Sequence, residues 1–372
     1  MDPGPVETTQ DAVSEVAEPV AAPAAASRSR ARLGVDLGLL ALVGVLLVAA
    51  LGAGAAVVYH DFYSPRAFVL RYLDLLSERH AADALGVAGV TVDSAELEAA
   101  GLPGTSSAAL LRRDALAPLT DVEVVSEEPL GDTTRITVSY RAGSVPGTTT
   151  FSVERAGTIG VAPTWRFATS PLAVIDLTVR GSMSFDVNGF TVDKRQVSPD
   201  GADADPLASV PLLVFSPGIY SVSVDTQIAA TPGVAVLSDS PLTQTPVIVQ
   251  ATATDEFVSL VQNSVDEFLT SCATQDVLQP TGCPFGYLVQ DRIVSPPTWS
   301  IVQQPAVRLE PDGAGWSMPP TDATAHIEVD IRSLFDGSVR HVREDVPFIV
   351  TAQISVLPDG KVNIAVSGPD TR

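Results

Sequence analysis

The chain is poor in the side chains that most often carry chemistry: of its 372 residues only two are lysine, four histidine and two cysteine. A penicillin-binding active site needs Ser-x-x-Lys, but Thr191 and Pro358 stand three residues before the two lysines. The sequence also lacks a Gly-x-Ser-x-Gly elbow, His-Glu-x-x-His and a phosphate loop ending in Gly-Lys-Ser/Thr. We therefore predict no catalytic residue, no cofactor and no metal.

Positive charge is scarce as well. The 22 Lys and Arg face 44 Asp and Glu, which gives a net charge of −22. From residue 60 onward, 38 acidic residues face 19 basic ones, a net charge of −19 for that part alone. Such a surface repels nucleic acid, anionic lipid head groups and anionic wall polymers. A nucleic-acid partner is excluded on this ground.

What the chain does have is one long apolar run. Residues 37–59 (LGLLALVGVLLVAALGAGAAVVY) carry no charge. At a rise of about 1.5 Å per residue they span about 34 Å, enough to cross a hydrocarbon core of about 30 Å. The run predicts a single transmembrane helix that separates a short N-terminal tail from a large C-terminal head.

The flanks of this run predict its orientation. Three arginines precede the run, whereas Arg66 is the first basic residue that follows it (the three are Arg28, Arg30 and Arg32). Because Lys and Arg stay on the cytoplasmic side, the tail is expected in the cytoplasm and the head outside it. The alternative is a cleaved signal peptide with its site at Ala53-Gly54-Ala55, but the run is longer than the 7–15 apolar residues typical of such peptides.

Small residues on the run would also let two helices approach each other. Gly34-x-x-x-Gly38 and Gly52-x-x-x-Ala56 match the small-xxx-small pattern of membrane helix dimers. A homodimer through the helix is therefore one expectation for the partners of this chain.

Residues 1–34 are rich in Ala, Pro, Glu and Val and contain no aromatic residue, which predicts a disordered tail. Glu7-Thr8-Thr9 resembles the Glu-Thr-Thr phosphorylation motif of small actinobacterial forkhead-associated-domain proteins; the alternative is a solvated polar tail. The composition, with twenty Arg against two Lys and much Ala, Val, Gly, Pro and Asp, also resembles that of actinobacterial proteins.

The two cysteines, Cys272 and Cys283, lie close together in the predicted extracytoplasmic head. An even count in an oxidising compartment predicts a disulfide between them. Two thiolates without a nearby histidine supply half a zinc site, and a catalytic thiol would need a partner base. A structural bridge is therefore expected.

Residues 62–170 predict a module of helices followed by strands. Ser64-Pro65 is a helix start, with an apolar face continuing to about residue 85, and further helices are predicted at 94–100 and 106–115. Alternating strands with turn residues between them follow, which predicts helices packed on an antiparallel sheet. The pattern resembles the cystatin-like fold of the nuclear transport factor two superfamily.

Residues 171–252 show no helical periodicity and predict a small β-sandwich, with Asn188-Gly189 as a hairpin turn. Two segments, Phe185-Asp-Val-Asn188-Gly189 and Phe215-Ser-Pro217-Gly218-Ile-Tyr220-Ser-Val222, resemble β modules named after a Pro-Glu-Gly-Ala repeat and those of teicoplanin-resistance-associated membrane proteins. The acidic insertion at residues 200–205 departs from that pattern.

Residues 253–369 repeat the first module's order. Asp255 and Glu256 open a helix that runs to the disulfide, followed by strands at 299–309, 315–318, 323–331, 347–357 and 361–366, with a turn at 358–360. This predicts a second cystatin-like module. The expected fold is thus one transmembrane helix plus an α+β and β head, with two cystatin-like modules flanking a β-sandwich.

Two groups of side chains could form sites. His326, Glu328 and Asp330 share one face of a strand and could ligate a metal; the alternative is the polar side of an amphipathic strand. A second group, Asp200, Asp203 and Asp205, could bind calcium but lacks the spacing of known loops, which favours a solvated acidic loop.

These observations predict a membrane-anchored extracytoplasmic protein of the bacterial envelope that binds or scaffolds another envelope protein or a wall component and does not catalyse a reaction. One alternative is a hydrolase or transferase whose site is built from residues distant in sequence. A transmembrane sensor is the other, although a tail of about 36 residues is too short for a folded signalling domain.

Overall fold

The computed structural model describes residues 30–160, 162–357 and 361–368. The predictions for Thr8, Thr9 and the turn at 358–360 lie outside the described residues. Contacts divide the chain into two units, Met1–Tyr59 and His60–Arg372. In the first, helix α1 (Arg30–Val58) contains the window Leu37–Gly54, whose mean hydropathy is 2.5 and none of which is buried. By length and composition this helix fits a membrane anchor or a signal sequence.

A short π-helical turn, η1 (Tyr59–Tyr63), follows α1, and the head that begins there is mostly β. Its helical elements are α2 (Pro65–Ser77), α3 (Ala81–Leu85), α4 (Ser94–Ala99), η2 (Ala108–Leu110), η3 (Arg113–Ala115), α5 (Lys194–Val197), η4 (Gly201–Asp203) and α6 (Asp255–Ala273). The strands of the first half are β1 (Leu119–Leu130), β2 (Thr133–Ala142), β3 (Val145–Ile159), β4 (Ala162–Phe167), β5 (Leu172–Arg180), β6 (Ser184–Val187), β7 (Phe190–Asp193) and β8 (Val210–Phe215). Those of the second half are β9 (Gly218–Asp225), β10 (Ala229–Ser238), β11 (Gln244–Gln250), β12 (Thr252–Ala253), β13 (Arg292–Ile293), β14 (Thr298–Gln303), β15 (Glu310–Asp312), β16 (Gly315–Arg332), β17 (Val339–Val356) and β18 (Val362–Ser367).

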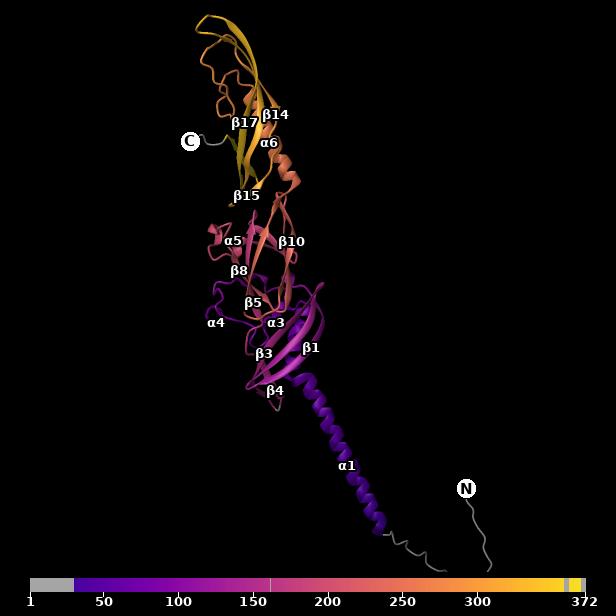
Figure 1. The fold of residues 1–372 in the computed structure, drawn as a ribbon. Helices are drawn as coiled ribbons and strands as arrows, with labels where there is room; N and C mark the ends of the chain where they lie inside the picture. The colour runs from indigo at the N-terminus through magenta and orange to yellow at the C-terminus, as the bar shows by residue number, and fades with distance from the viewer. Residues whose placement is uncertain (1–29, 161, 358–360, 369–372) are drawn as a thin grey trace, which may run out of the picture. The chain divides into compact units, whose positions relative to one another are not determined.

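The first sheet is an antiparallel meander in the order β1-β2-β3-β4, with α2 packed on it (Figure 1). Helix α2 begins where predicted, because the Ser64 side chain accepts the Ala67 N–H and Pro65 occupies the first turn. Its apolar face buries Phe68 and Tyr72 against aromatic rings of the sheet.

Two predicted helices of this region are wrong. The first does not reach residue 85 unbroken: α2 ends at Ser77, Arg79 adopts a left-handed φ of 61°, and α3 starts afresh. The helix expected at 106–115 is two 3-10 turns, because the Ser107 N–H donates to Pro211 O and the Leu213 N–H donates to Ser107 O. This long-range bridge to β8 overrides the local helical pattern.

The middle of the chain forms two sheets, β12-β10-β9-β6-β7 and β11-β5-β8, and β11 pairs with β5 in parallel. The hairpin at Asn188-Gly189 is confirmed, with φ of 52° and 85° at the two residues. The Asn188 side chain donates to Ile219 O and accepts the Ser221 N–H. The two segments that resemble Pro-Glu-Gly-Ala modules therefore contact each other. The one-turn α5 and η4 were not expected there.

Strand β5 contributes side chains to two hydrophobic cores, because both of its faces are buried. Leu172 and Val174 pack with the core beneath α2, whereas Ile175 and Leu177 pack with the five-stranded sheet and with the core beneath α6. The predicted boundary at residue 170 is thus crossed by a continuous core. The three-module division remains a prediction.

The last sheet has the order β13-β16-β17-β18, with β14 and β15 also paired to β16. Helix α6, capped by Thr254, covers one face of it (Figure 1). The strand predicted at 299–309 stops at Gln303. The Gln262 side chain of α6 donates to Pro305 O and accepts the Val307 N–H, and these bonds hold the remaining residues on the helix.

Candidate functional site

The uncovered face of the last sheet carries a polar ladder, which we define as His326, Glu328 and Asp330 on β16 with His341, Arg343 and Asp345 on β17. The strand register sets them directly opposite one another as the pairs His326–Asp345, Glu328–Arg343 and Asp330–His341. Opposite residues on one face of an antiparallel pair lie about 4.5–5.5 Å apart at Cβ, so each pair can interact.

Each pair contains a group that can be positive and a carboxylate. His326 Nδ1 lies 2.6 Å from Asp345 Oδ1, and His341 Nδ1 lies 2.7 Å from Asp330 Oδ1. The Arg343 Nε lies 3.4 Å from Glu328 Oε1 and also donates to His341 Nε2 over 2.9 Å. Because His341 Nε2 accepts that bond, its ring proton belongs on Nδ1, toward Asp330.

The ladder is accessible. Its side chains are between 28 % and 65 % exposed, whereas the alternating residues Ile327 and Val329 are buried in the core. The three predicted residues therefore do share one strand face. Among the described residues, no group of three or more His, Cys, Asp or Glu is arranged to hold a metal ion. The carboxylates are engaged by neighbouring side chains, which suits hydrogen bonding to a partner more than metal ligation.

The other predicted group does not come together. Asp200, Asp203 and Asp205 lie around the turn η4, and the Asp205 carboxylate caps the Leu207 N–H at 2.8 Å. The same loop is held by Lys194, whose Nζ donates to Pro206 O at 2.8 Å and to Ala208 O at 2.5 Å. Lys194 is only 2 % exposed, and burial lowers the pKa of its ammonium group while Asp205 opposes this. The hydrogen bonds of Lys194 thus attach the acidic loop to α5.

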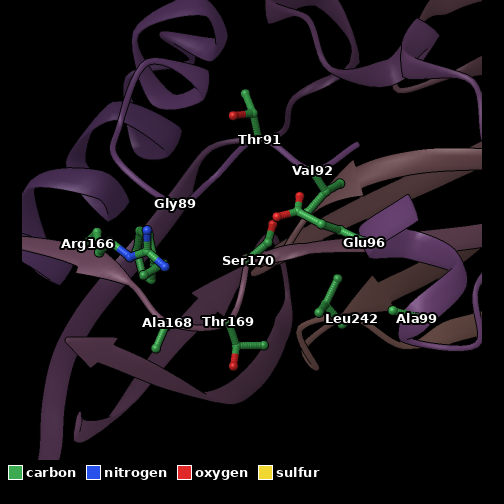
Figure 2. Close-up of a pocket in the computed structure, with 11 residues that line it drawn as sticks. Gly89, Thr91, Val92, Glu96, Ala99, Arg166, Ala168, Thr169, Ser170 and Leu242 are labelled. Carbon is green, nitrogen blue, oxygen red and sulfur yellow. The ribbon is translucent and has the colours of Figure 1, made fainter. Parts of the chain in front are cut away.

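A cavity of about 420 Å³ lies between α4, the loop before it and the end of β4 (Figure 2). Figure 2 shows Arg166 on one side of it and Leu242 with Ala99 on the other. Gly89 forms part of the wall. A side chain would not fit at this position, since a Cβ there would stand 2.3 Å from Phe167 O.

Three polar side chains of this cavity make structural bonds. The Glu96 carboxylate accepts the Asp93 N–H in a capping box, and Arg166 Nε donates to Glu154. The Ser170 hydroxyl donates to Val90 O. Each of these groups is engaged in a structural bond, so the cavity offers a shape more than a set of unsatisfied polar groups.

A second cavity, of about 570 Å³, lies where the five-stranded sheet meets β16. Its wall mixes apolar side chains such as Met183 and Ile228 with Arg195 and Asp203. Arg195 is held by Asp193 through two bonds, and this arginine holds the pKa of the Asp193 carboxyl below its usual value.

Cys272 and Cys283 form a disulfide that joins the end of α6 to the following segment. His80 occupies the N-cap position of α3 without a side-chain cap bond, and its Nδ1 lies 3.3 Å from Glu78 Oε2. His60 falls among the residues whose side chains are not described.

The sequence reasoning missed half of the ladder. His341, Arg343 and Asp345 alternate along the chain in the same way as the three predicted residues, and this second alternation was the available signal. The burial of Lys194 had no such signal, because it depends on where the acidic loop folds back.

No family model, curated protein or solved structure matches this chain.

Proposed function

We propose that the protein is a single-pass anchored protein of the bacterial envelope whose head lies outside the cytoplasm and binds or scaffolds another envelope component. The observation that carries the proposal is the uncovered ladder face of the last sheet. An antiparallel sheet with one buried face and one solvated face offers a flat and rigid surface to a partner.

The anchored location is supported by two features. Helix α1 contains an apolar window long enough to cross a bilayer, and the head contains a disulfide, which is typical of oxidising compartments. Orientation follows from the arginines that precede the apolar run in the sequence. A reporter active only outside the cytoplasm should give signal when fused after Arg372. Signal from a cytoplasm-only reporter instead would refute the orientation.

The binding role is supported by the chemistry of the ladder. Its three carboxylates face one arginine, so the partner is expected to present hydrogen-bond donors or positive charge. Because β16 is paired with β14 on one side and with β17 on the other at His326 and Glu328, a partner would meet these groups already in place.

A photo-reactive side chain at Ser300, which lies opposite His326 on β14, tests this in the native envelope. A matched probe at exposed Thr148 on β3 serves as control. We expect a specific crosslinked product from position 300 and none from 148. Exchanging the charges, Glu328→Arg together with Arg343→Glu, should keep the pair but abolish the product. Equal products from both positions would contradict a binding face.

The competing proposal is an enzyme. It predicts turnover of a wall peptide, glycan or ester by the purified chain and loss of that turnover when a polar cluster is removed. Turnover that disappears in the triple variant His326→Ala, Glu328→Ala, Asp330→Ala would replace the binding proposal.

We also infer that the two helix-and-sheet regions are cystatin-like and that the middle region is a Pro-Glu-Gly-Ala-type β module. Support comes from the order of helix then antiparallel meander in α2–β4 and from the contact between Asn188 and the segment around Tyr220. An experimental structure of the head whose residues 62–170 superpose on a cystatin-like domain would test the assignment.

A further inference from the structure

The connection between β16 and β17 and the first residue of β17 expose three apolar side chains. Phe335 is 99 % exposed, Leu334 is 73 % exposed and Val339 is 53 % exposed. The neighbouring segment adds Ile293 and Val294, also exposed. A protein with a net charge of −22 gains nothing in solubility from such a group, and exposed apolar clusters mark interaction sites.

The backbone N–H groups of this turn are already satisfied. Every N–H from residue 333 to residue 338 donates to an acceptor within the head. The bonds are Ser333 N to Ser338 O, Leu334 N to Asp291 Oδ1, Phe335 N and Asp336 N to Ser333 Oγ, Gly337 N to Ser333 O, and Ser338 N to Asp336 Oδ1. These bonds remove part of the cost of entering an apolar medium, because unpaired backbone groups are costly there.

Two arginines stand beside the turn. Arg292 on β13 and Arg332 on β16 are register partners, and both are exposed. Neither guanidinium group forms an ion pair or hydrogen bond with any residue in the described parts of the chain. Like charges directly opposite each other destabilise a sheet, so this pair lowers its energy when an anion lies between the guanidinium groups.

We propose that this tip, defined as Arg292 and Arg332 with Leu334, Phe335 and Val339, docks on the surface of an anionic phospholipid bilayer. The phosphate groups lie against the two arginines, and the Phe and Leu side chains enter the interfacial region, where aromatic side chains are favoured. Charge complementarity selects this occupant, because two guanidinium groups without a side-chain partner lie beside exposed apolar side chains, whereas the carboxylates of Asp291 and Asp336 in the same region accept backbone N–H groups and the rest of the head is acidic.

Asp336 limits the depth of entry. Its carboxylate lies at the apex and accepts hydrogen bonds from the Ser338 N–H and hydroxyl. A charged carboxylate is expensive in hydrocarbon, so the tip rests at the level of the head groups. The site is independent of the ladder's proposed partner, although the two share the hairpin.

Tryptophan quenching tests the proposal. The full chain carrying Phe335→Trp is reconstituted in neutral phosphatidylcholine vesicles and mixed with acceptor vesicles of brominated phosphatidylcholine and phosphatidylglycerol. Leu130→Trp, at the exposed β1–β2 turn, is the matched control, and the wild-type protein gives the background of the three native tryptophans. Both substitutions are on exposed side chains, so neither perturbs folding.

We expect quenching at position 335 and none above background at 130. Adding Arg292→Ser and Arg332→Ser should weaken the quenching about 30-fold in apparent partitioning, since each basic residue near an anionic membrane contributes about fivefold. High salt should act in the same direction.

Placing the brominated lipids with phosphatidylglycerol in the protein's own vesicles, without acceptors, shows whether the tip reaches its own bilayer. Quenching in either arrangement supports bilayer docking. Equal signals from positions 335 and 130 in both arrangements overturn it. An emission shift that grows with protein concentration in the absence of anionic lipid would instead assign the tip to contacts between copies of the chain, and would also overturn it.

Discussion

The regions α2–β4 and α6–β18 have the same order of elements, a helix followed by an antiparallel sheet, yet different contacts hold them together. In the first, four aromatic rings gather beneath α2: Phe68, Tyr72, Phe151 and Phe167. In the second, rings and a disulfide pin the segment after the helix, with Phe285 packed between Trp299 and Phe348. The first region is stabilised by packing a helix on its sheet. The last region is stabilised in this way and also by packing the segment after its helix on the sheet.

The hydrogen bonds of one tryptophan in each region show the same contrast. Trp165 Nε1 donates to Tyr63 O before α2, whereas Trp299 Nε1 donates to Val277 O after α6. The apolar spacing along each helix predicts a core but does not reveal which flanking segment completes it. Similar sequence patterns can therefore conceal different weak points.

The largest effect is expected in the aromatic cluster. Phe167→Ala removes a ring that is 1 % exposed and lies 5.0 Å, centroid to centroid, from both Phe68 and Tyr72. We expect a loss of about 3–5 kcal/mol in the free energy of unfolding, measured by denaturant titration. Leu130→Ala, at an exposed turn, should change it by less than about 0.5 kcal/mol. A similar loss from both variants would show that the cluster is not the source of stability.

The disulfide of the last region comes next. Replacing Cys272 and Cys283 by serine should lower stability by about 3 kcal/mol, because the bridge closes a loop across a sequence separation of 11 residues. Non-reduced peptide mapping should recover one linked pair from the wild-type protein. Alkylation of free thiols in the wild-type protein would contradict the bridge, and unchanged stability would show that the rings alone hold the loop.

A smaller effect is expected on the pH dependence of stability, to which Tyr72 of the first region contributes. Burial, followed by the nearby Tyr220, raises the pKa of Tyr72 well above its ordinary value. A raised folded-state pKa gives stability that is fully present below about pH 10 and is lost as pH rises above it, because the unfolded tyrosine ionises first. Stability should therefore fall above about pH 10, by up to about 1.4 kcal/mol per pH unit from Tyr72.

Tyr72→Phe should flatten this decline, at the cost of the hydrogen bond to Ser216 O. Exposed Tyr63 provides the matched control, since Tyr63→Phe should leave the decline unchanged. Urea titrations between pH 8 and 11 make the comparison. An identical pH dependence in the wild type and Tyr72→Phe would exclude Tyr72 as its origin.

How far the sequence predicts this molecule depends on how local each feature is. The helix start at Ser64, the hairpin at Asn188 and the apolar helix are encoded within a few residues, and their predictions are confirmed. The helix at 106–115 and the strand at 299–309 fail because distant groups capture their backbone: β8 in one case and Gln262 in the other. The polar ladder is intermediate, since each half alternates visibly but the pairing requires the register of β16 and β17.

The smallest effect on stability is expected from substitutions in the ladder. These substitutions also test whether the last region, and not the first, contacts the partner. In the triple variant His326→Ala, Glu328→Ala, Asp330→Ala, three cross-strand pairs are lost, each worth about 0.2–1 kcal/mol in a sheet and less where solvent screens them. The opposite face of β16 stays buried in the core that it shares with α6, so thermal unfolding and membrane localisation should change little. Crosslinking from Ser300 should nevertheless disappear, because the groups that meet the partner are gone.

As a matched change in the first region, Thr137→Ala removes an exposed cross-strand bond to Thr150 and should leave crosslinking intact. If the triple variant unfolds the head, the ladder stabilises the sheet instead of presenting it; if crosslinking persists in a folded head, the partner binds elsewhere.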